Sequence, residues 1–91
     1  MNFKAENNEW HHGFQMTFEN QFTISVQFSK GSYSDKGETT AEVAAWDNKG
    51  NWFYFGDYGW NPLENRDTEV MARQTTDDVA RMISELVKLK Q

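Results

Sequence analysis

One stretch of sequence decides the fold of this chain: Ala41-Glu42-Val43-Ala44-Ala45-Trp46-Asp47-Asn48-Lys49-Gly50-Asn51-Trp52-Phe53-Tyr54-Phe55. It predicts a β-hairpin whose loop is Asn48-Lys49-Gly50, with Gly50 at the left-handed position of a bulge-type turn. This loop places Trp46 opposite Trp52, Ala45 opposite Phe53, Ala44 opposite Tyr54 and Val43 opposite Phe55.

Because side chains alternate between the two faces of a strand, the hairpin carries aromatic rings on both faces. Val43, Ala45, Phe53 and Phe55 share one face, and Trp46, Trp52, Tyr54 and Ala44 share the other. One of these faces can cover a hydrophobic core. The other requires a second explanation.

Two strands are predicted upstream of this hairpin, at residues 14–19 and 22–28, because apolar and polar residues alternate in both. A three-residue loop, Glu19-Asn20-Gln21, pairs Phe18 with Phe22 and keeps the two apolar faces on the same side. Gln21 then occupies a position that favours glycine, at a cost of roughly 1 kcal/mol.

The remaining segments are predicted from the same kind of pattern. Residues 1–13 are expected to form an irregular N-terminal arm, docked by Trp10, and residues 14–91 a single α+β domain. Residues 29–38 have loop composition, and residues 56–69 are expected to form a long loop. A third strand is expected from about Thr39 to Trp46, and a short extra strand around residues 69–73.

A C-terminal helix is predicted after Thr75, which serves as the N-cap with Asp78 in the reciprocal capping-box position. Its apolar stripe is spaced as one helical face requires, at Val79, Met82, Ile83, Leu86 and Val87. Ala41 and Ala45 are small enough for this stripe to approach the sheet closely. The predicted fold class is therefore α+β, a four-stranded antiparallel meander, with room for a short fifth strand, and one helix on one face.

Composition limits the function classes. The chain has 91 residues, a net charge of −5, 14 acidic and 9 basic side chains, and no cysteine. This balance disfavours direct binding to a phosphate backbone, and the lack of cysteine excludes disulfides and thiolate metal sites. No signal peptide or membrane-spanning run is present, so a cytoplasmic protein without membrane attachment is expected.

No residue set predicts catalysis, a cofactor or a metal. His11-His12 lacks a third strong ligand, and Asp47-Asn48-Lys49-Gly50-Asn51 lacks the ligands of a calcium loop. Ser29, Ser32 and Ser34 have no signature of an activated nucleophile, and Glu42 is expected to be a solvated strand carboxylate. We therefore expect a non-enzymatic protein.

The candidate site is the outer aromatic surface, with partner-binding residues predicted at Trp46, Trp52, Tyr54, Tyr58 and Trp60. Exposed Trp and Tyr residues are common interface anchors. An interpretation of equal weight is that the N-terminal arm with Trp10, or the 56–69 segment, covers this surface. Base stacking on these rings is a third interpretation, which the acidic charge disfavours.

The segments Phe22–Phe28, Tyr33, Thr40–Asp47 and Gly50-Asn51-Trp52 resemble those of small uncharacterised accessory proteins of tailed bacteriophages. The likeness covers about residues 14–90, and the chain departs from it at Gln21 and in the segment 56–69. It implies a phage accessory protein that acts in the host cytoplasm by binding and blocking a host protein, such as a defence nuclease.

Four functions follow as hypotheses. The first is a non-enzymatic protein-binding module that engages a host or phage protein through the aromatic face and the adjoining loops. The second is an acidic decoy that mimics nucleic acid, which would use Asp57, Glu64, Asp67, Glu69, Asp77 and Asp78. The third is a hydrolase or transferase, which would need a pocket of converging polar groups. The fourth is a homodimer that hides the aromatic face around a two-fold axis.

Overall fold

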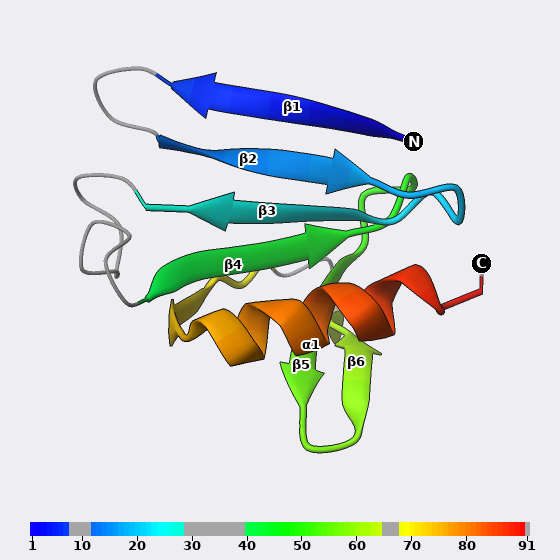
Figure 1. Ribbon diagram of the computed structural model, residues 1–91. Coiled ribbons are helices and arrows are strands. Elements are labelled where there is room, and N and C mark those ends of the chain that lie inside the picture. Colours follow the sequence, from blue (N-terminus) through cyan, green and yellow to red (C-terminus); the bar gives the residue numbers. More distant parts are fainter. Residues whose placement is uncertain (8–11, 29–39, 65–67, 91) are drawn as a thin grey trace.

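The computed structural model describes residues 1–7, 12–28, 40–64 and 68–90. These residues form an antiparallel sheet with one C-terminal helix, which confirms the α+β class (Figure 1). The described part of the chain has more strands than the four or five predicted. They are β1 (Asn2–Asn7), β2 (His12–Thr17), β3 (Thr23–Gln27), β4 (Ala41–Trp46), β5 (Trp52–Gly56), β6 (Gly59–Pro62) and β7 (Met71–Gln74), and the helix is α1 (Thr76–Val87).

The strands β1 to β6 lie in chain order across the sheet, so each pairs with its sequence neighbour. The β2–β3 hairpin has the predicted register, with Phe14 opposite Val26 and Met16 opposite Ile24. Its three-residue loop closes with a 2.9 Å hydrogen bond from Phe18 N to Phe22 O, and Gln21 has a φ of 70°. The sequence-based prediction of a strained Gln21 is confirmed.

The strand β4 has different partners at its two ends. The pairs Trp46–Trp52 and Ala45–Phe53 form as predicted. Val43 lies opposite Met71 of β7 and not opposite Phe55, so that part of the predicted register is wrong. The strand β5 leaves β4 to pair with β6, and β7 occupies the edge that it vacates. Both ends of β4 thereby have a strand partner on this edge, with an irregularity between Ala41 and Val43.

The N-terminal segment corrects a second expectation. Residues 2–7 form β1 and not an irregular arm, with Phe3 opposite Met16 and Ala5 opposite Phe14. The alternation of Phe3 and Ala5 with Lys4 and Glu6 is the signal for this strand. The proposed docking of Trp10 and the loop at 29–38 lie outside the described residues.

The third correction concerns residues 56–69, which do not form one long loop. Gly56 and Gly59 pair across a two-residue turn, Asp57-Tyr58, and Gly59 takes a φ of 104°. This turn brings β6 back along β5 and places Trp60 opposite Phe55. A positive φ without a Cβ penalty explains a glycine at this position.

The helix α1 begins as predicted. The Thr75 side chain accepts a hydrogen bond from Asp78 N, and the Asp78 carboxylate accepts one from Thr75 N. Its C-terminal end is closed from the β2–β3 loop, because Asn20 Nδ2 donates to Leu86 O at 2.9 Å and to Leu89 O at 2.8 Å. These bonds satisfy carbonyl groups that a helix end leaves without partners.

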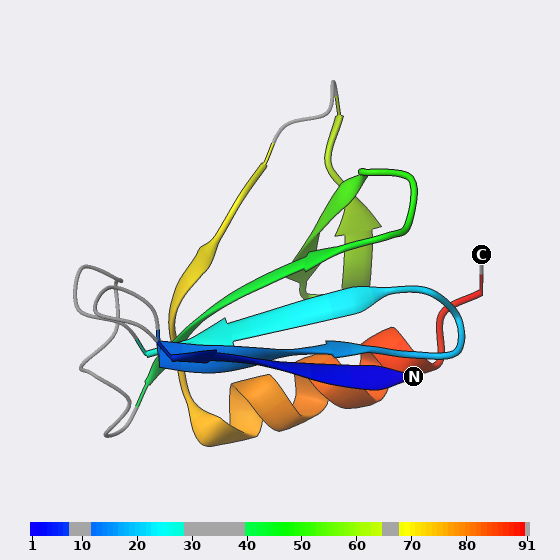
Figure 2. The ribbon, with the colours of Figure 1, turned by 90° about the horizontal axis from the view of Figure 1, so that it is seen from above.

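The core lies between α1 and one face of the sheet (Figures 1 and 2). Met82 and Leu86 are almost fully buried and Val79 and Ile83 pack against them, which confirms most of the predicted stripe. Val87 is 50% exposed and Leu89 packs against the core instead. The sheet contributes the remaining buried apolar side chains: Phe22, Ile24, Val26, Ala41, Val43, Ala45 and Trp60.

Candidate binding site on the outer sheet face

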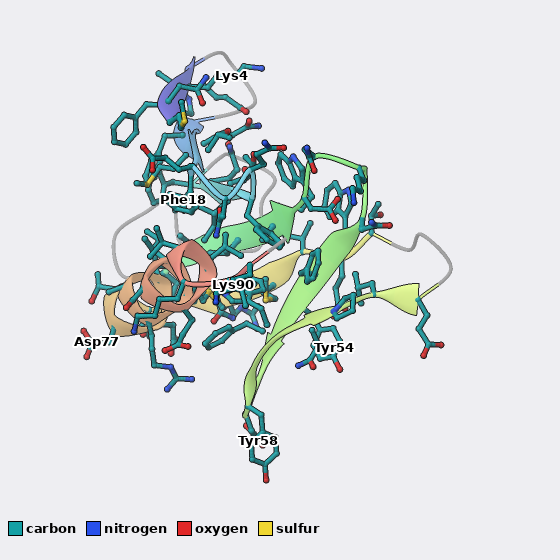
Figure 3. The ribbon with its side chains drawn as sticks, turned by 90° about the vertical axis from the view of Figure 1, so that its right-hand side faces the viewer. Lys4, Phe18, Tyr54, Tyr58, Asp77 and Lys90 are labelled. Atoms are coloured by element: carbon teal, nitrogen blue, oxygen red, sulfur yellow. The ribbon has the colours of Figure 1, made fainter. Side chains whose placement is uncertain are left out.

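The face of the sheet away from α1, here called the outer face, holds the side chains that alternate with the core. Lys4 and Glu6 of β1 lie on it, because Phe3 and Ala5 pair with core-facing residues of β2. The labelled side chains of Lys4 and Tyr54 project on this side in Figure 3. No described helix lies over the outer face (Figure 2).

Two indole rings mark one part of the outer face. Trp46 and Trp52 are stacked, with ring centroids 5.0 Å apart and planes 29° from parallel. Both are half-buried, and neither belongs to the hydrophobic core cluster. The prediction that these two rings point away from the helix is therefore confirmed.

Beside the rings, the central strands carry a buried polar network. Gln27, only 9% exposed, donates from Nε2 to Ser25 Oγ at 3.1 Å and to Glu6 Oε2 at 3.2 Å. Gln15 Nε2 donates to Glu6 Oε1 at 2.8 Å. Buried polar groups need such partners, because an unpaired one costs about 1–3 kcal/mol. The network fixes the Glu6 carboxylate over the middle of the sheet.

Gly13 makes this network possible. It lies between Glu6 on β1 and Gln27 on β3, opposite both in the two registers. A Cβ built on Gly13 would lie 2.1 Å from Val26 O and 3.0 Å from Gln27 Oε1. Because glycine leaves this space open, the Gln27 amide reaches across β2 to Glu6.

The rings and the polar network line a common groove of about 210 Å³. Two carboxylates, Glu6 and Glu42, lie in its lining, and Val70 approaches from the segment before β7. The described residues of its lining are Glu6, Gln15, Ser25, Gln27, Glu42, Ala44, Trp46, Trp52 and Val70. Among these residues there is no lysine or arginine.

The polar network was not predicted from the sequence, although β2 and β3 contain a signal for it. Outward positions of the neighbouring strands β2 and β3 are polar except for Gly13: Gln15 and Thr17 on β2, and Thr23, Ser25 and Gln27 on β3. All the side chains of β3 are nevertheless buried. Burial of the β3 residues follows from the strands on either side, and the sequence of one strand does not show it.

The other predicted anchor residues have different surroundings. Tyr54 lies on the outer face and is 39% exposed. Tyr58 is fully exposed at the tip of the β5–β6 hairpin, which projects from the rest of the sheet (Figure 3). Neither lines the groove. The structure therefore brings Trp46 and Trp52 together at the groove and places Tyr54 and Tyr58 outside it.

Trp60 is not part of an exposed surface, so its assignment to one is wrong. It is 9% exposed, its ring centroid lies 5.1 Å from that of Phe55, and its Nε1 donates to Met82 O at 3.0 Å. The β5–β6 turn sets this orientation, because it places Trp60 on the same face as Phe55. Trp60 joins β6 to α1.

The loop of the β4–β5 hairpin is organised by Asp47. Its Oδ1 accepts from Lys49 N at 2.8 Å and Asn51 N at 2.9 Å, and its Oδ2 accepts from Asn51 Nδ2 at 3.0 Å. Burial raises the pKa of Asp47, but these hydrogen bonds outweigh it and hold the pKa below the usual value. The Asp47 carboxylate thus stabilises the turn that positions Trp46 and Trp52.

The geometry of the described residues gives little support to the metal site or the catalytic site considered from the sequence. Within the described residues, no three His, Cys, Asp or Glu side chains come together as a metal site would require; His11 lies outside them. The groove does supply a concavity with polar groups, as a catalytic hypothesis requires. Ser25, however, receives its hydrogen bond from the Gln27 amide, which cannot act as a general base.

The carboxylates of the decoy hypothesis lie on separate elements. Asp57 is in the β5–β6 turn, Glu64 and Glu69 lie between β6 and β7, and Asp77 and Asp78 are in the first turn of α1. Asp67 lies outside the described residues. A decoy needs carboxylates in one array, and the described ones come from three different segments of the chain.

A second cavity, of about 340 Å³, lies on the helix side of the sheet. Its lining is mainly apolar and includes residues of β2, β3, β4, β7 and α1. Phe28 and Thr40, which flank the undescribed segment 29–39, form part of its wall.

Comparisons with known proteins were made on the whole chain. No protein-family model, no curated protein and no solved structure matches it. In the described part of the chain, no helix has the length and apolarity needed to cross a membrane.

Proposed function

We propose that this protein is a non-enzymatic binding module that engages a partner protein through the outer-face groove. The observation that carries the proposal is the stacked Trp46–Trp52 pair, held at the edge of a polar groove on the sheet face that the helix leaves uncovered. Half-buried tryptophans beside satisfied polar groups are typical of the centre of an interface.

The groove also indicates the chemistry of the partner. Its described lining contains the Glu6 carboxylate and no basic residue, so a segment with Lys or Arg next to an apolar side chain complements it. The cation would meet the Glu6 region, and the apolar group would rest against the indoles. Arg and Lys also bind well to the face of a Trp ring.

From the resemblance to phage accessory proteins, we propose that this partner is a bacterial host protein and that binding inhibits it in the host cytoplasm. This step rests on the resemblance alone. The decoy hypothesis stays an alternative, but the groove supports a protein segment better than the dispersed carboxylates support nucleic-acid mimicry.

The test compares affinity capture from bacterial lysate by the intact chain and by Trp46→Ala and Trp52→Ala variants. Each variant should retain its circular dichroism spectrum and lose at least tenfold in capture of the same protein, because truncated hot-spot residues cost about 2 kcal/mol or more. Val87→Ala, a substitution of an exposed apolar side chain on α1, is the matched control and should capture normally.

Two results would contradict the proposal. Unchanged capture by folded Trp46→Ala and Trp52→Ala variants would remove the groove from the interface. Unfolding of both variants would show that the rings serve only to stabilise the hairpin. Binding that weakens steeply with added salt while both variants capture normally would instead favour the acidic decoy.

A further inference from the structure

The strand β1 is an open edge of the sheet. It pairs with β2 on one side, and no described element lies beyond it on the other (Figure 1). Its outward N–H and C=O groups are available to another strand, and such edges are the usual sites of strand addition. Phe3, on the helix-side face of β1, is 74% exposed because α1 does not extend over this strand.

We infer that β1 pairs with β1 of a second copy of this chain, antiparallel across a two-fold axis, to give one continuous sheet. The interface would be the same segment on both chains, as a two-fold axis requires. It shares only Glu6 with the outer-face groove, and the inference does not depend on the proposed function.

Symmetry limits the register of this pairing. In an antiparallel pair, residues opposite each other lie on the same face of the sheet. A two-fold axis perpendicular to the sheet must therefore place one residue opposite the same residue of the second chain. Two registers overlap most of β1. One centres on Lys4, and the other centres on Ala5 and spans residues 3–7.

Charge selects between these two registers. Centring on Lys4 sets the two Lys4 side chains directly opposite each other, which is unfavourable. Centring on Ala5 sets Lys4 opposite Glu6 of the second copy, twice, on the outer face. A lysine in an edge strand normally prevents pairing, but here the second copy supplies the opposite charge.

The Glu6 carboxylate can accept this additional partner. Gln15 and Gln27 each donate one hydrogen bond to it, one to each oxygen. A carboxylate has about four acceptor positions, so an ammonium group can be added without loss of either bond. On the opposite face, Phe3 and Ala5 of both copies would continue the apolar row that Phe14 and Met16 begin.

The register is tested by single cysteines, since the chain has none of its own. Under mild oxidation, Ala5→Cys should form a disulfide-linked dimer in high yield, because each Ala5 faces its own copy. Asn2→Cys, on the same strand, is the control and should cross-link only at the background level.

The charge pairing is tested by light scattering on the intact chain. The wild type should reach twice the chain mass of 10.7 kDa with rising concentration. Lys4→Glu should weaken this association roughly tenfold or more, since it places like charges opposite each other twice. The double variant Lys4→Glu/Glu6→Lys should restore it. Trp52→Ala should leave it unchanged.

Each alternative has a distinct signature. A wild type that stays monomeric, with Ala5→Cys no more reactive than Asn2→Cys, would overturn the inference. A dimer that forms without the Ala5 cross-link and is lost in Trp52→Ala would instead place the two-fold axis at the aromatic face. Association of Lys4→Glu that is as strong as that of the wild type would show that charge does not set the register.

Discussion

At the scale of single residues, the sequence around Gln21 predicts a positive φ at a residue that is not glycine. The alternating faces of the two flanking strands require an odd loop, and the third loop residue must then adopt a positive φ. The observed φ of 70° lowers the stability of the folded state, because a residue with a side chain disfavours this conformation. The Gln21 Oε1 accepts a hydrogen bond from Asn48 Nδ2 of the neighbouring hairpin loop, which offsets part of the cost.

We therefore expect Gln21→Gly to raise the free energy of unfolding by up to about 1 kcal/mol, because glycine adopts positive φ without strain. Urea unfolding monitored by circular dichroism measures the change. Gln21→Ala is the control: it keeps the strain, loses the contact with Asn48, and should be no more stable than the wild type. A less stable Gln21→Gly variant would show that the contact with Asn48 outweighs the strain.

At the scale of elements, the β4–β5 hairpin depends on the Asp47 carboxylate. The ionised form is stabilised by three hydrogen bonds within the loop, which lower the pKa of Asp47 below its usual value. A carboxylate with a lowered pKa in the folded state adds stability above its unfolded pKa. That stability disappears as the pH falls through the folded pKa.

Asp47→Asn should lower the free energy of unfolding at pH 7 by about 1–3 kcal/mol, because hydrogen bonds to a charged acceptor are lost. The difference from the wild type should begin to shrink below about pH 4, the usual pKa of an aspartate, and should vanish as the pH falls through the lowered pKa of the folded state. Urea titrations across this pH range provide the measurement. A difference that stays constant with pH would mean that charge does not contribute.

At the scale of the whole molecule, two tryptophans on adjacent strands have different roles because they lie on opposite faces of the sheet. Trp60 packs on Phe55 and donates to Met82 O of α1, so it links the β5–β6 hairpin to the helix. Trp52 stacks on Trp46 on the outer face. Substitution by alanine should therefore reduce mainly stability at Trp60 and mainly partner binding at Trp52.

Trp60→Ala should cost about 3–5 kcal/mol of unfolding free energy, a large part of the stability of a small domain. Trp52→Ala should cost about 1 kcal/mol, the scale of a cross-strand aromatic pair. Thermal and urea unfolding of both variants test this order. An equal loss at the two positions would mean that the outer indoles contribute to the core, which would weaken the proposed binding role.

Much of the fold could be predicted from the sequence because its signals are local. The alternation in β2, β3 and β5 set the faces of the side chains, and the Thr75–Asp78 capping box set the start of α1. The outward direction of Trp46 and Trp52 followed from the same alternation. These features depend on neighbours within a few residues along the chain, so a single sequence contains them.

The features that could not be predicted depend on contacts between segments that are distant in the sequence. The strand β7 fills the edge of β4 that β5 leaves, and this replaced the predicted partner of Val43. The two-residue turn after Gly56 carried Trp60 into the core, and Gly13 opened the space through which Gln27 reaches Glu6. Packing and pairing between distant segments fix these outcomes, because burial is a property of the assembled sheet and helix and not of any one strand.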